Sequence, residues 1–200
     1  MDARATAQDA APTRRSQMKA DRRKQLLSAA AKLIAERGYN GVRLEDIGAE
    51  VGISGPAIYR HFPNKEALLV ELLTGVSDHL LYGGTEVADN ASDAEAALAG
   101  LIEFHLDFAI NQSDLIRVQD RDLHSLPREA QHQVRMMQRR YVERWVQVLM
   151  DLNPDLDAVS ARTKAHAVFG LINSTPHSAR APAARTRELL RNMAKAALAS

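Results

Sequence analysis

The chain has 200 residues, of which 46% are hydrophobic and 26% charged, so it is long enough for one ordinary domain or two small ones. It has no cysteine, which excludes disulfides, thiolate metal sites and cysteine nucleophiles and fits a reducing cytoplasm. No apolar run approaches the roughly 20 residues of a membrane helix, and the first twenty residues lack the apolar core of a secretory signal.

The net charge of +1 conceals an asymmetry between the two parts of the chain. Residues 1–65 carry 12 Lys and Arg against 7 Asp and Glu, whereas residues 66–200 carry 14 against 18. A basic front and an acidic remainder favour contact with a polyanion at the front alone. The excess is modest, so an ordinary solvated surface is the alternative interpretation.

The first expected elements are an arm and a helix. Residues 1–20 show no periodicity and predict a flexible basic arm. Residues 21–37 predict a helix, because apolar residues recur on one face, Asp21 can cap its start and Gly38 can end it. The cations of this region form either a solubility tail or an arm that contacts DNA: Arg14, Arg15, Lys19, Arg22 and Arg23.

Two short helices follow, over residues 44–51 and 55–62, separated by the turn 52–54. The second of them ends at Pro63, because the residue before a proline is pushed away from the α region. A fourth helix is expected over residues 65–81.

The rest of the chain predicts longer helices and no strand. Apolar residues recur at spacings of three and four, and turn residues separate the segments. The sequence therefore indicates an all-α protein of nine helices. The five later ones are expected over 93–110, 114–123, 127–152, 157–174 and 184–199.

The two short helices with their glycine-containing turn have the pattern of a helix-turn-helix. The second helix of such a motif enters a DNA major groove about 12 Å wide, so its first residues meet base edges. Ile58 and Phe62 are expected to face the core. Arg60 is placed to contact either a guanine or a phosphate. His61 either contacts phosphate or is only a charge at the end of the helix. Lys65 either contacts phosphate or is ordinary solvated surface. The candidate DNA-contacting residues are Arg43, Ser54, Gly55, Pro56, Ala57, Tyr59, Arg60, His61 and Lys65.

The stretch "AAKLIAERGYNGVRLEDIGAEVGISGPAIYRHFPNKEALL", residues 30–69, resembles the N-terminal domain of the TetR/AcrR family of transcriptional regulators. The matching features are Gly38, the run 51–54, the run 58–62 and the run 64–66. The resemblance implies a DNA-binding domain over 21–65 and a ligand-binding, dimerising domain over 66–200. Arg43 departs from the pattern, which usually has Thr or Ser there. A capping hydroxyl is lost and a guanidinium that can reach phosphate is gained.

The second domain offers candidate ligand-binding residues. Its apolar helices carry aromatic and polar side chains that either line a pocket or pack as core: Leu101, Phe104, His105, Phe108, Met137, Tyr141, Trp145, His166, Phe169 and Asn173. The ligand is either an acyl-CoA, whose phosphates the arginines around 117–140 would meet, or another small hydrophobic effector. Acidic residues are interleaved with those arginines, as on an ordinary solvated helix. No metal or cofactor is expected.

The resemblance also implies a homodimer through the last two helices and a cytoplasmic repressor. Two subunits would read the halves of a palindromic operator, and a ligand would release them by moving the connecting segment 66–81. Two other classes remain open. One is a helical partner-binding scaffold, which would leave the run 52–69 unexplained. The other is an all-helical enzyme, for which the sequence shows no catalytic set.

Overall fold

The computed structural model describes residues 13–178 and 180–199. All nine expected helices are present in this part of the chain, which contains no strand and adds one short helix, α9. The helices are α1 (Arg14–Arg37), α2 (Leu44–Glu50), α3 (Gly55–Ile58), α4 (Lys65–Asp89), α5 (Ala94–Asn111), α6 (Ser113–Asp122), α7 (Arg128–Leu152), α8 (Ala158–Ile172), α9 (Thr175–Ser178) and α10 (Ala183–Ala199), with 3-10 turns η1 (Tyr39–Gly41) and η2 (Leu123–Ser125).

Helix α1 begins earlier than the sequence pattern predicts. The Thr13 hydroxyl accepts a hydrogen bond from the Ser16 amide at 3.3 Å and caps the helix, so residues 14–20 are helical and the expected arm is wrong for them. Residues 1–12, the rest of that arm, lie outside the described residues. The helix ends where expected, at Gly38, whose φ of 79° suits glycine.

Helix α3 is shorter than the expected span 55–62. Its helical part stops at Ile58, and a tight turn follows, in which the Arg60 amide donates to the Ala57 carbonyl at 3.2 Å. The amides of His61 and Phe62 both donate to the Ile58 carbonyl, at 2.8 and 3.0 Å, so one further irregular turn forms before Pro63 ends the segment. Ile58 and Phe62 are both fully buried, which confirms that they face the core.

Helix α4 extends eight residues past the expected end at 81, through the pair Gly83 and Gly84. A side-chain Cβ on either glycine would overlap an aromatic ring, Phe104 at Gly83 and Tyr141 at Gly84. Glycine at these two positions leaves room for the rings, so α5 and α7 can pack closely against α4. This packing outweighs the low helix propensity of glycine.

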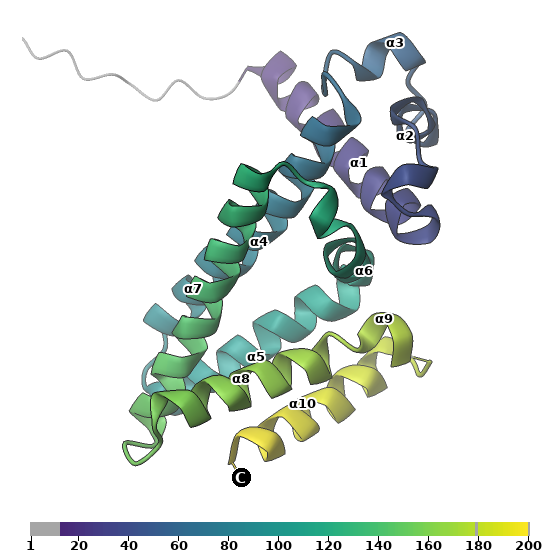
Figure 1. The fold of residues 1–200 in the computed structure, drawn as a ribbon. Coiled ribbons are helices and arrows are strands. Elements are labelled where there is room, and N and C mark those ends of the chain that lie inside the picture. The colour runs from purple at the N-terminus through teal and green to yellow at the C-terminus, as the bar shows by residue number, and fades with distance from the viewer. Residues whose placement is uncertain (1–12, 179, 200) are drawn as a thin grey trace, which may run out of the picture.

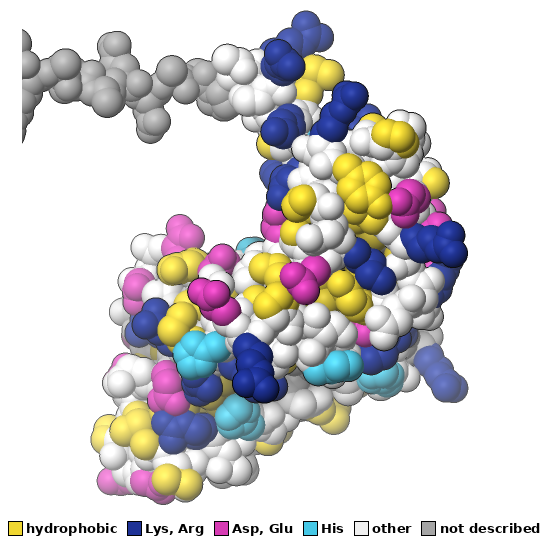
Figure 2. Space-filling model, turned by 45° about the horizontal axis from the view of Figure 1, so that its top comes forward, with side chains coloured by type: hydrophobic (Ala, Val, Ile, Leu, Met, Phe, Trp, Pro, Cys, Tyr) yellow, Lys and Arg dark blue, Asp and Glu magenta, His cyan; other side chains and the backbone are white. Residues whose placement is uncertain are grey.

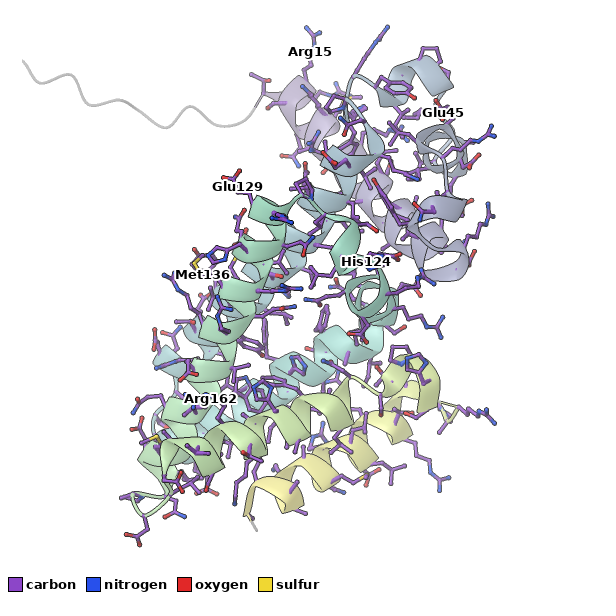
Figure 3. All side chains as sticks on the ribbon, in the orientation of Figure 1. Arg15, Glu45, His124, Glu129, Met136 and Arg162 are labelled. Carbon is purple, nitrogen blue, oxygen red and sulfur yellow. The ribbon has the colours of Figure 1, made fainter. Side chains whose placement is uncertain are left out.

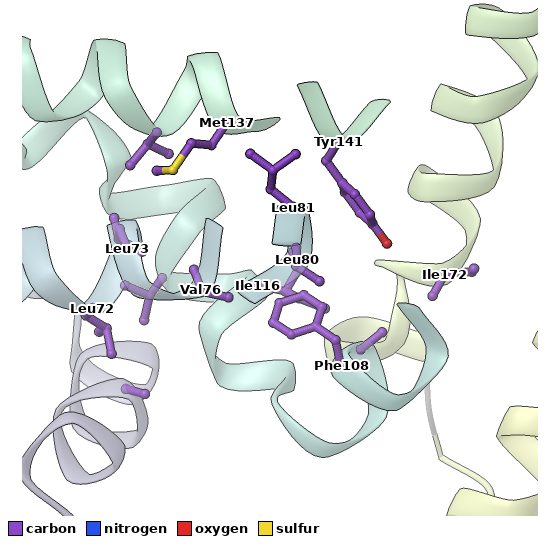
Figure 4. Packing of buried hydrophobic residues seen from close by; sticks show 14 of the residues in the cluster. Leu72, Leu73, Val76, Leu80, Leu81, Phe108, Ile116, Met137, Tyr141 and Ile172 are labelled. Atoms are coloured by element: carbon purple, nitrogen blue, oxygen red, sulfur yellow. The ribbon is translucent and has the colours of Figure 1, made fainter. Parts of the chain in front are cut away.

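The helices form two groups joined by α4. Helices α1–α3 lie together at one end, and α4 runs from them into the group formed by α5, α7, α8 and α10 (Figure 1). Helix α6 lies between α1 and the second group. Buried aliphatic and aromatic side chains from α4, α5, α6, α7 and α8 meet in the core (Figure 4). No helix among the described residues is long and apolar enough to span a membrane, and these residues form no cluster able to hold a metal ion.

Candidate nucleic-acid interface and effector site

The turn and the third helix place several candidate DNA contacts at the surface. Ser54, Pro56, Tyr59 and Arg60 are exposed, and Arg43 is exposed at the start of α2. Gly55, Ala57 and His61 are half-buried. Figure 2 shows Lys and Arg side chains spread over this end of the molecule. These exposed residues all belong to the unit formed by α1–α3 and the turns between and after them.

The head of α2 is capped without a side-chain hydroxyl. The Arg43 amide donates to the Asp46 carboxylate at 2.9 Å, which satisfies the first backbone donor of the helix. The Arg43 guanidinium is not needed as a cap and stays at the exposed surface. This arrangement explains how the chain tolerates a residue without a cap hydroxyl at this position.

Tyr59 on the turn after α3 is paired with an acidic residue of α2. Its hydroxyl donates to Glu45 Oε1 at 2.5 Å. This hydrogen bond raises the pKa of Tyr59 and lowers the pKa of Glu45, because it favours the neutral phenol and the ionised carboxylate. The carboxylate therefore remains charged near neutral pH, at the surface where DNA phosphates are expected.

Two expected arm cations hold the domain together instead. Arg22 donates to the Val51 carbonyl at 3.0 Å. Arg23 donates to Glu71 of α4 and to the His61 carbonyl, and its guanidinium stacks on the Phe62 ring at 4.2 Å. Both side chains are thus structural tethers between α1, the turns and α4. Arg14, Arg15 and Lys19 are exposed on the first turns of α1.

His61 and Lys65 lie less openly than expected of phosphate donors. Burial, followed by the charge of Arg23, lowers the pKa of His61, so its ring is neutral near pH 7. The Lys65 ammonium donates to the carbonyls of Tyr39 at 2.7 Å and Val42 at 2.9 Å, and lies 4.2 Å from the centre of the Tyr39 ring. Lys65 therefore fixes the loop between α1 and α2 against the start of α4.

A second set of contacts ties α6 to the end of α1. The Arg121 guanidinium donates to the carbonyls of Ile34 and Ala35 and pairs with Asp122 at 3.0 Å. The buried Asp122 carboxylate accepts from the Tyr39 amide at 3.3 Å. We call this set the Arg121–Asp122 clasp. Sequence reasoning missed it and grouped Arg121 with possible ligand-binding arginines. The only signal in the sequence was a cation in the last turn of a short helix. Such cations are common at helix ends, so this one did not indicate a contact with α1.

The second group of helices encloses an aromatic cluster around His105. Its Nε2 lies 3.1 Å from Asn173 Oδ1, and its Nδ1 lies 3.4 Å from the Tyr141 hydroxyl. Its ring centre is 4.8 Å from that of Phe169 and 6.2 Å from that of Trp145. Burial lowers the pKa of His105 to about 4, so its ring is neutral at pH 7. Burial likewise raises the pKa of Tyr141.

The expected ligand set does not form a single site. His105, Phe108, Tyr141, Trp145, Phe169 and Asn173 come together. Phe104 instead packs against His79, with ring centres 5.2 Å apart. Leu101 and Met137 are buried core residues. His166 is exposed, so the expectation that it lines the interior is wrong. Asn173, the C-cap of α8, instead meets His105.

An open pocket of about 410 Å³ meets this cluster at Asn173, the one residue that the pocket wall and the cluster share. Asn173 contributes to its wall, together with Gln119, Asp120, Leu123 and His124 of α6 and η2 and with Arg135 and Gln138 of α7. Burial raises the pKa of Asp120. The lining offers amide, guanidinium and imidazole groups, so the pocket suits a ligand with oxygen acceptors. A larger open groove of about 820 Å³ lies where α1 meets the α5–α6 junction.

Fold and site together define a helix-turn-helix DNA-binding regulator with a separate helical domain. Residues 26–72 match the model of the bacterial regulatory proteins of the tetR family, and residues 91–177 match a tetracyclin repressor-like C-terminal domain. The chain is 37% identical over 84 residues to the HTH-type transcriptional repressor KstR2 of Rhodococcus jostii, which is 42% of this chain and 41% of that protein. It is 32% identical over 150 residues to KstR2 of Mycobacterium tuberculosis, which is 68% of this chain and 72% of that protein.

Solved structures show the same fold. The structure of the ketosteroid transcriptional regulator KstR2 of Mycobacterium tuberculosis covers 89% of this chain and 93% of its own, with a TM-score of 0.76 at 22% identity. The structure of AibR in complex with isovaleryl coenzyme A and operator DNA covers 86% and 97%, with a TM-score of 0.69 at 17% identity. The chain belongs to the TetR family. Its members are transcription regulators rather than enzymes, which confirms the expected function class.

Proposed function

We propose that the protein is a dimeric, cytoplasmic repressor that leaves a palindromic operator when a small hydrophobic or acyl-CoA-type ligand binds its second domain. The observation that carries this proposal is the exposed surface of Arg43, Tyr59 and Arg60 on a three-helix unit that is clasped to α6. Relatives are named both repressor and activator, and the KstR2 relatives favour repression. The domain division at residue 65 is part of the proposal.

The proposed DNA contacts divide by chemistry. Arg43 and Tyr59 would donate to phosphates, and Arg60 would address a phosphate or a guanine edge. The small and apolar residues would let the α3 backbone approach the bases: Ser54, Gly55, Pro56 and Ala57. Lys65 would support this surface from within the protein, because its ammonium bonds to the carbonyls of Tyr39 and Val42. His61 would do the same, since its Nδ1 is buried.

The proposed dimer forms through α8 and α10. Leu189 and Met193 project from α10 with about half of each side chain exposed, and Val159 is exposed on α8. Isolated apolar residues at a surface are common, but this set lies on the two helices that cover one side of the second domain (Figure 1). Val168 of α8 and Leu190 of α10 are buried within the subunit and lie outside the proposed interface. A two-fold dimer would place two α3 helices on successive half-sites, roughly 34–36 Å apart.

The proposed effector site is the pocket whose wall includes Asn173, the hydrogen-bond partner of His105. Because the neutral His105 ring carries its proton on Nε2 when it donates to Asn173 Oδ1, the Asn173 amide group can turn its N–H bonds toward the pocket. The aromatic cluster behind it would meet an apolar chain, and Arg135 would meet an anionic head group. A CoA thioester has a carbonyl acceptor, an apolar acyl chain and an anionic head group. The structure of AibR, which has the same fold, contains isovaleryl coenzyme A together with operator DNA.

The clasp gives the effector a route to the DNA surface. Asp120, Leu123 and His124 line the pocket on the same turn whose Arg121 and Asp122 hold α1. A ligand that moves this turn would change the hydrogen bonds between the Arg121–Asp122 clasp and the end of α1. The position of α1–α3 relative to α4 would then change, and with it the separation of the two recognition helices. The ligand can shift DNA affinity only by its different affinities for the two arrangements.

The experiment is a gel shift with the DNA upstream of the gene, with and without isovaleryl-CoA and stearoyl-CoA, and with free CoA as the control. We expect one discrete complex that a thioester dissociates and free CoA does not. A dimer that binds no palindrome would rule out the regulator function. An intact complex with every thioester would rule out the acyl-CoA class and leave another hydrophobic effector.

A further inference from the structure

The Glu45 side chain lies across the first turn of the recognition helix α3. A Cβ atom placed on Gly55 would come within 3.3 Å of Glu45 Cγ, and the Glu45 carboxylate accepts the Tyr59 hydroxyl at 2.5 Å. Glu45 thus bridges the start of α3 and the turn after it. Figure 3 shows Glu45 beside the ribbons of α2 and α3, at the end of the molecule farthest from α10.

This contact engages the Tyr59 hydroxyl with a negative charge. A phenol has a single O–H donor, so it cannot donate to Glu45 and to a DNA phosphate at once. Arg43 and Asp46 are the charged neighbours of Glu45, and their influences on it oppose each other. Neither of them makes a side-chain bond to Glu45 that would hold the carboxylate away from Tyr59.

A carboxylate and a phosphate oxygen are equivalent partners for the phenol. Both are anionic acceptors of short, charge-assisted hydrogen bonds. Tyr59 and Glu45 are both exposed, so a phosphate can reach the hydroxyl without any change in the core. The exchange of one acceptor for the other therefore needs only rotation of two surface side chains.

We propose that Glu45 is an intramolecular competitor of DNA phosphate for the Tyr59 hydroxyl and is displaced when the protein binds a duplex. The proposal rests on the proposed phosphate contact of Tyr59. Glu45 then lowers the affinity for every duplex, because each subunit must break the Glu45–Tyr59 bond and keep a carboxylate near the phosphates.

The test is a double-mutant cycle with Glu45→Ala, Tyr59→Phe and the double variant. The probe is a fluorescent 30-bp duplex of mixed sequence, and the readout is anisotropy at constant low salt. We expect Glu45→Ala to tighten binding about threefold per subunit, hence about tenfold per dimer, from the usual net strength of a hydrogen bond in proteins. In the Tyr59→Phe background the same change should give a clearly smaller gain, because no hydroxyl is released.

Glu50→Gln is the matched control. It removes one exposed carboxylate from the same helix and also breaks the Lys32–Glu50 ion pair at 2.9 Å, so it gives an upper estimate of the gain that comes from net charge. Equal gains from Glu45→Ala in the wild-type and Tyr59→Phe backgrounds would overturn the proposal in favour of general repulsion. A loss of affinity would overturn it in favour of Glu45 as a residue that preorganises Tyr59.

A measurement on the free protein separates this inference from the proposed function. The tyrosinate absorbance of Tyr59, obtained by subtracting the Tyr59→Phe spectrum, should appear at lower pH in Glu45→Ala than in the wild type. An unchanged titration would show that the contact is absent and would overturn the inference whatever DNA does. Failure of the wild type to bind any duplex, with the titration shifted, would instead refute the DNA-binding role on which the inference rests.

Discussion

The buried His105 ring should make the protein less stable in mild acid, by an amount that follows from its surroundings. Only 2% of the residue is exposed, its ring contacts are aromatic, and its nitrogens face Asn173 and Tyr141. Burial lowers its pKa to about 4 in the folded chain, whereas the ordinary value is 6.5. No carboxylate in the described contacts of His105 offsets the charge that protonation would create.

The sign and size of the effect come from proton linkage. Between pH 6.5 and pH 4 the unfolded chain holds the proton and the folded chain does not, so the free energy of unfolding falls as the pH falls. Above pH 6.5 His105 is neutral in both the folded and the unfolded chain, so this stability is fully present there. Between pH 7 and pH 5 the loss amounts to about 2 kcal/mol, because one unit of pKa shift corresponds to about 1.4 kcal/mol.

The assay is urea unfolding at pH 7 and pH 5 at one fixed protein concentration, since dimerisation would make stability depend on concentration. His105→Gln is uncharged at both pH values and can keep a bond to Asn173, so its loss between the two should be about 2 kcal/mol smaller than that of the wild type. His166→Gln removes an exposed histidine and should lose as much as the wild type. Equal losses in His105→Gln and the wild type would refute the neutral, buried ring.

Three further predictions concern packing, the clasp and DNA. Gly84→Ala should lower the free energy of unfolding by about 1–3 kcal/mol in urea melts, because its Cβ overlaps the Tyr141 ring; Gly75→Ala, with open space around it, should not, and equal effects would contradict the packing argument. Asp122→Ala should cost about 1–3 kcal/mol by the same melts, since it leaves the Tyr39 amide without its buried acceptor; an unchanged midpoint would show that the clasp is not formed. Arg43→Ala should reduce the salt slope of DNA binding by about 0.9 per subunit, and an unchanged slope would remove Arg43 from the phosphate contacts.

The helix-turn-helix could be predicted from the sequence because local signals determine it. Pro63 stops the segment after α3, and glycine at positions 38 and 52 takes the positive φ values that the turns need. The length of α4 could not be predicted in this way. Gly83 and Gly84 weaken a helix by propensity, and they remain helical only because rings from α5 and α7 occupy the space of their missing side chains.

The candidate sites also divide into features that local sequence signals predict and features that tertiary packing determines. Helical periodicity predicted the buried aromatic residues of α5 and α7, since a core face repeats regularly. It did not predict that His166 is exposed. It also carries no information on where the side chains of Arg22, Arg23 and Lys65 bind. Each of these cations bonds to groups 23 to 48 residues away in the chain, so its partner is set by tertiary packing. The Arg121–Asp122 clasp spans 83 to 87 residues for the same reason.

DNase footprinting of the upstream DNA tests the central claim most directly. A dimeric regulator should protect one near-palindromic site, with two half-sites about one helical turn apart. Arg60→Ala should lose that protection at the same protein concentration and keep its fold by circular dichroism. Uniform weak protection without a site, or a footprint that Arg60→Ala leaves intact, would contradict the account of α3 and its following turn as the DNA-reading element.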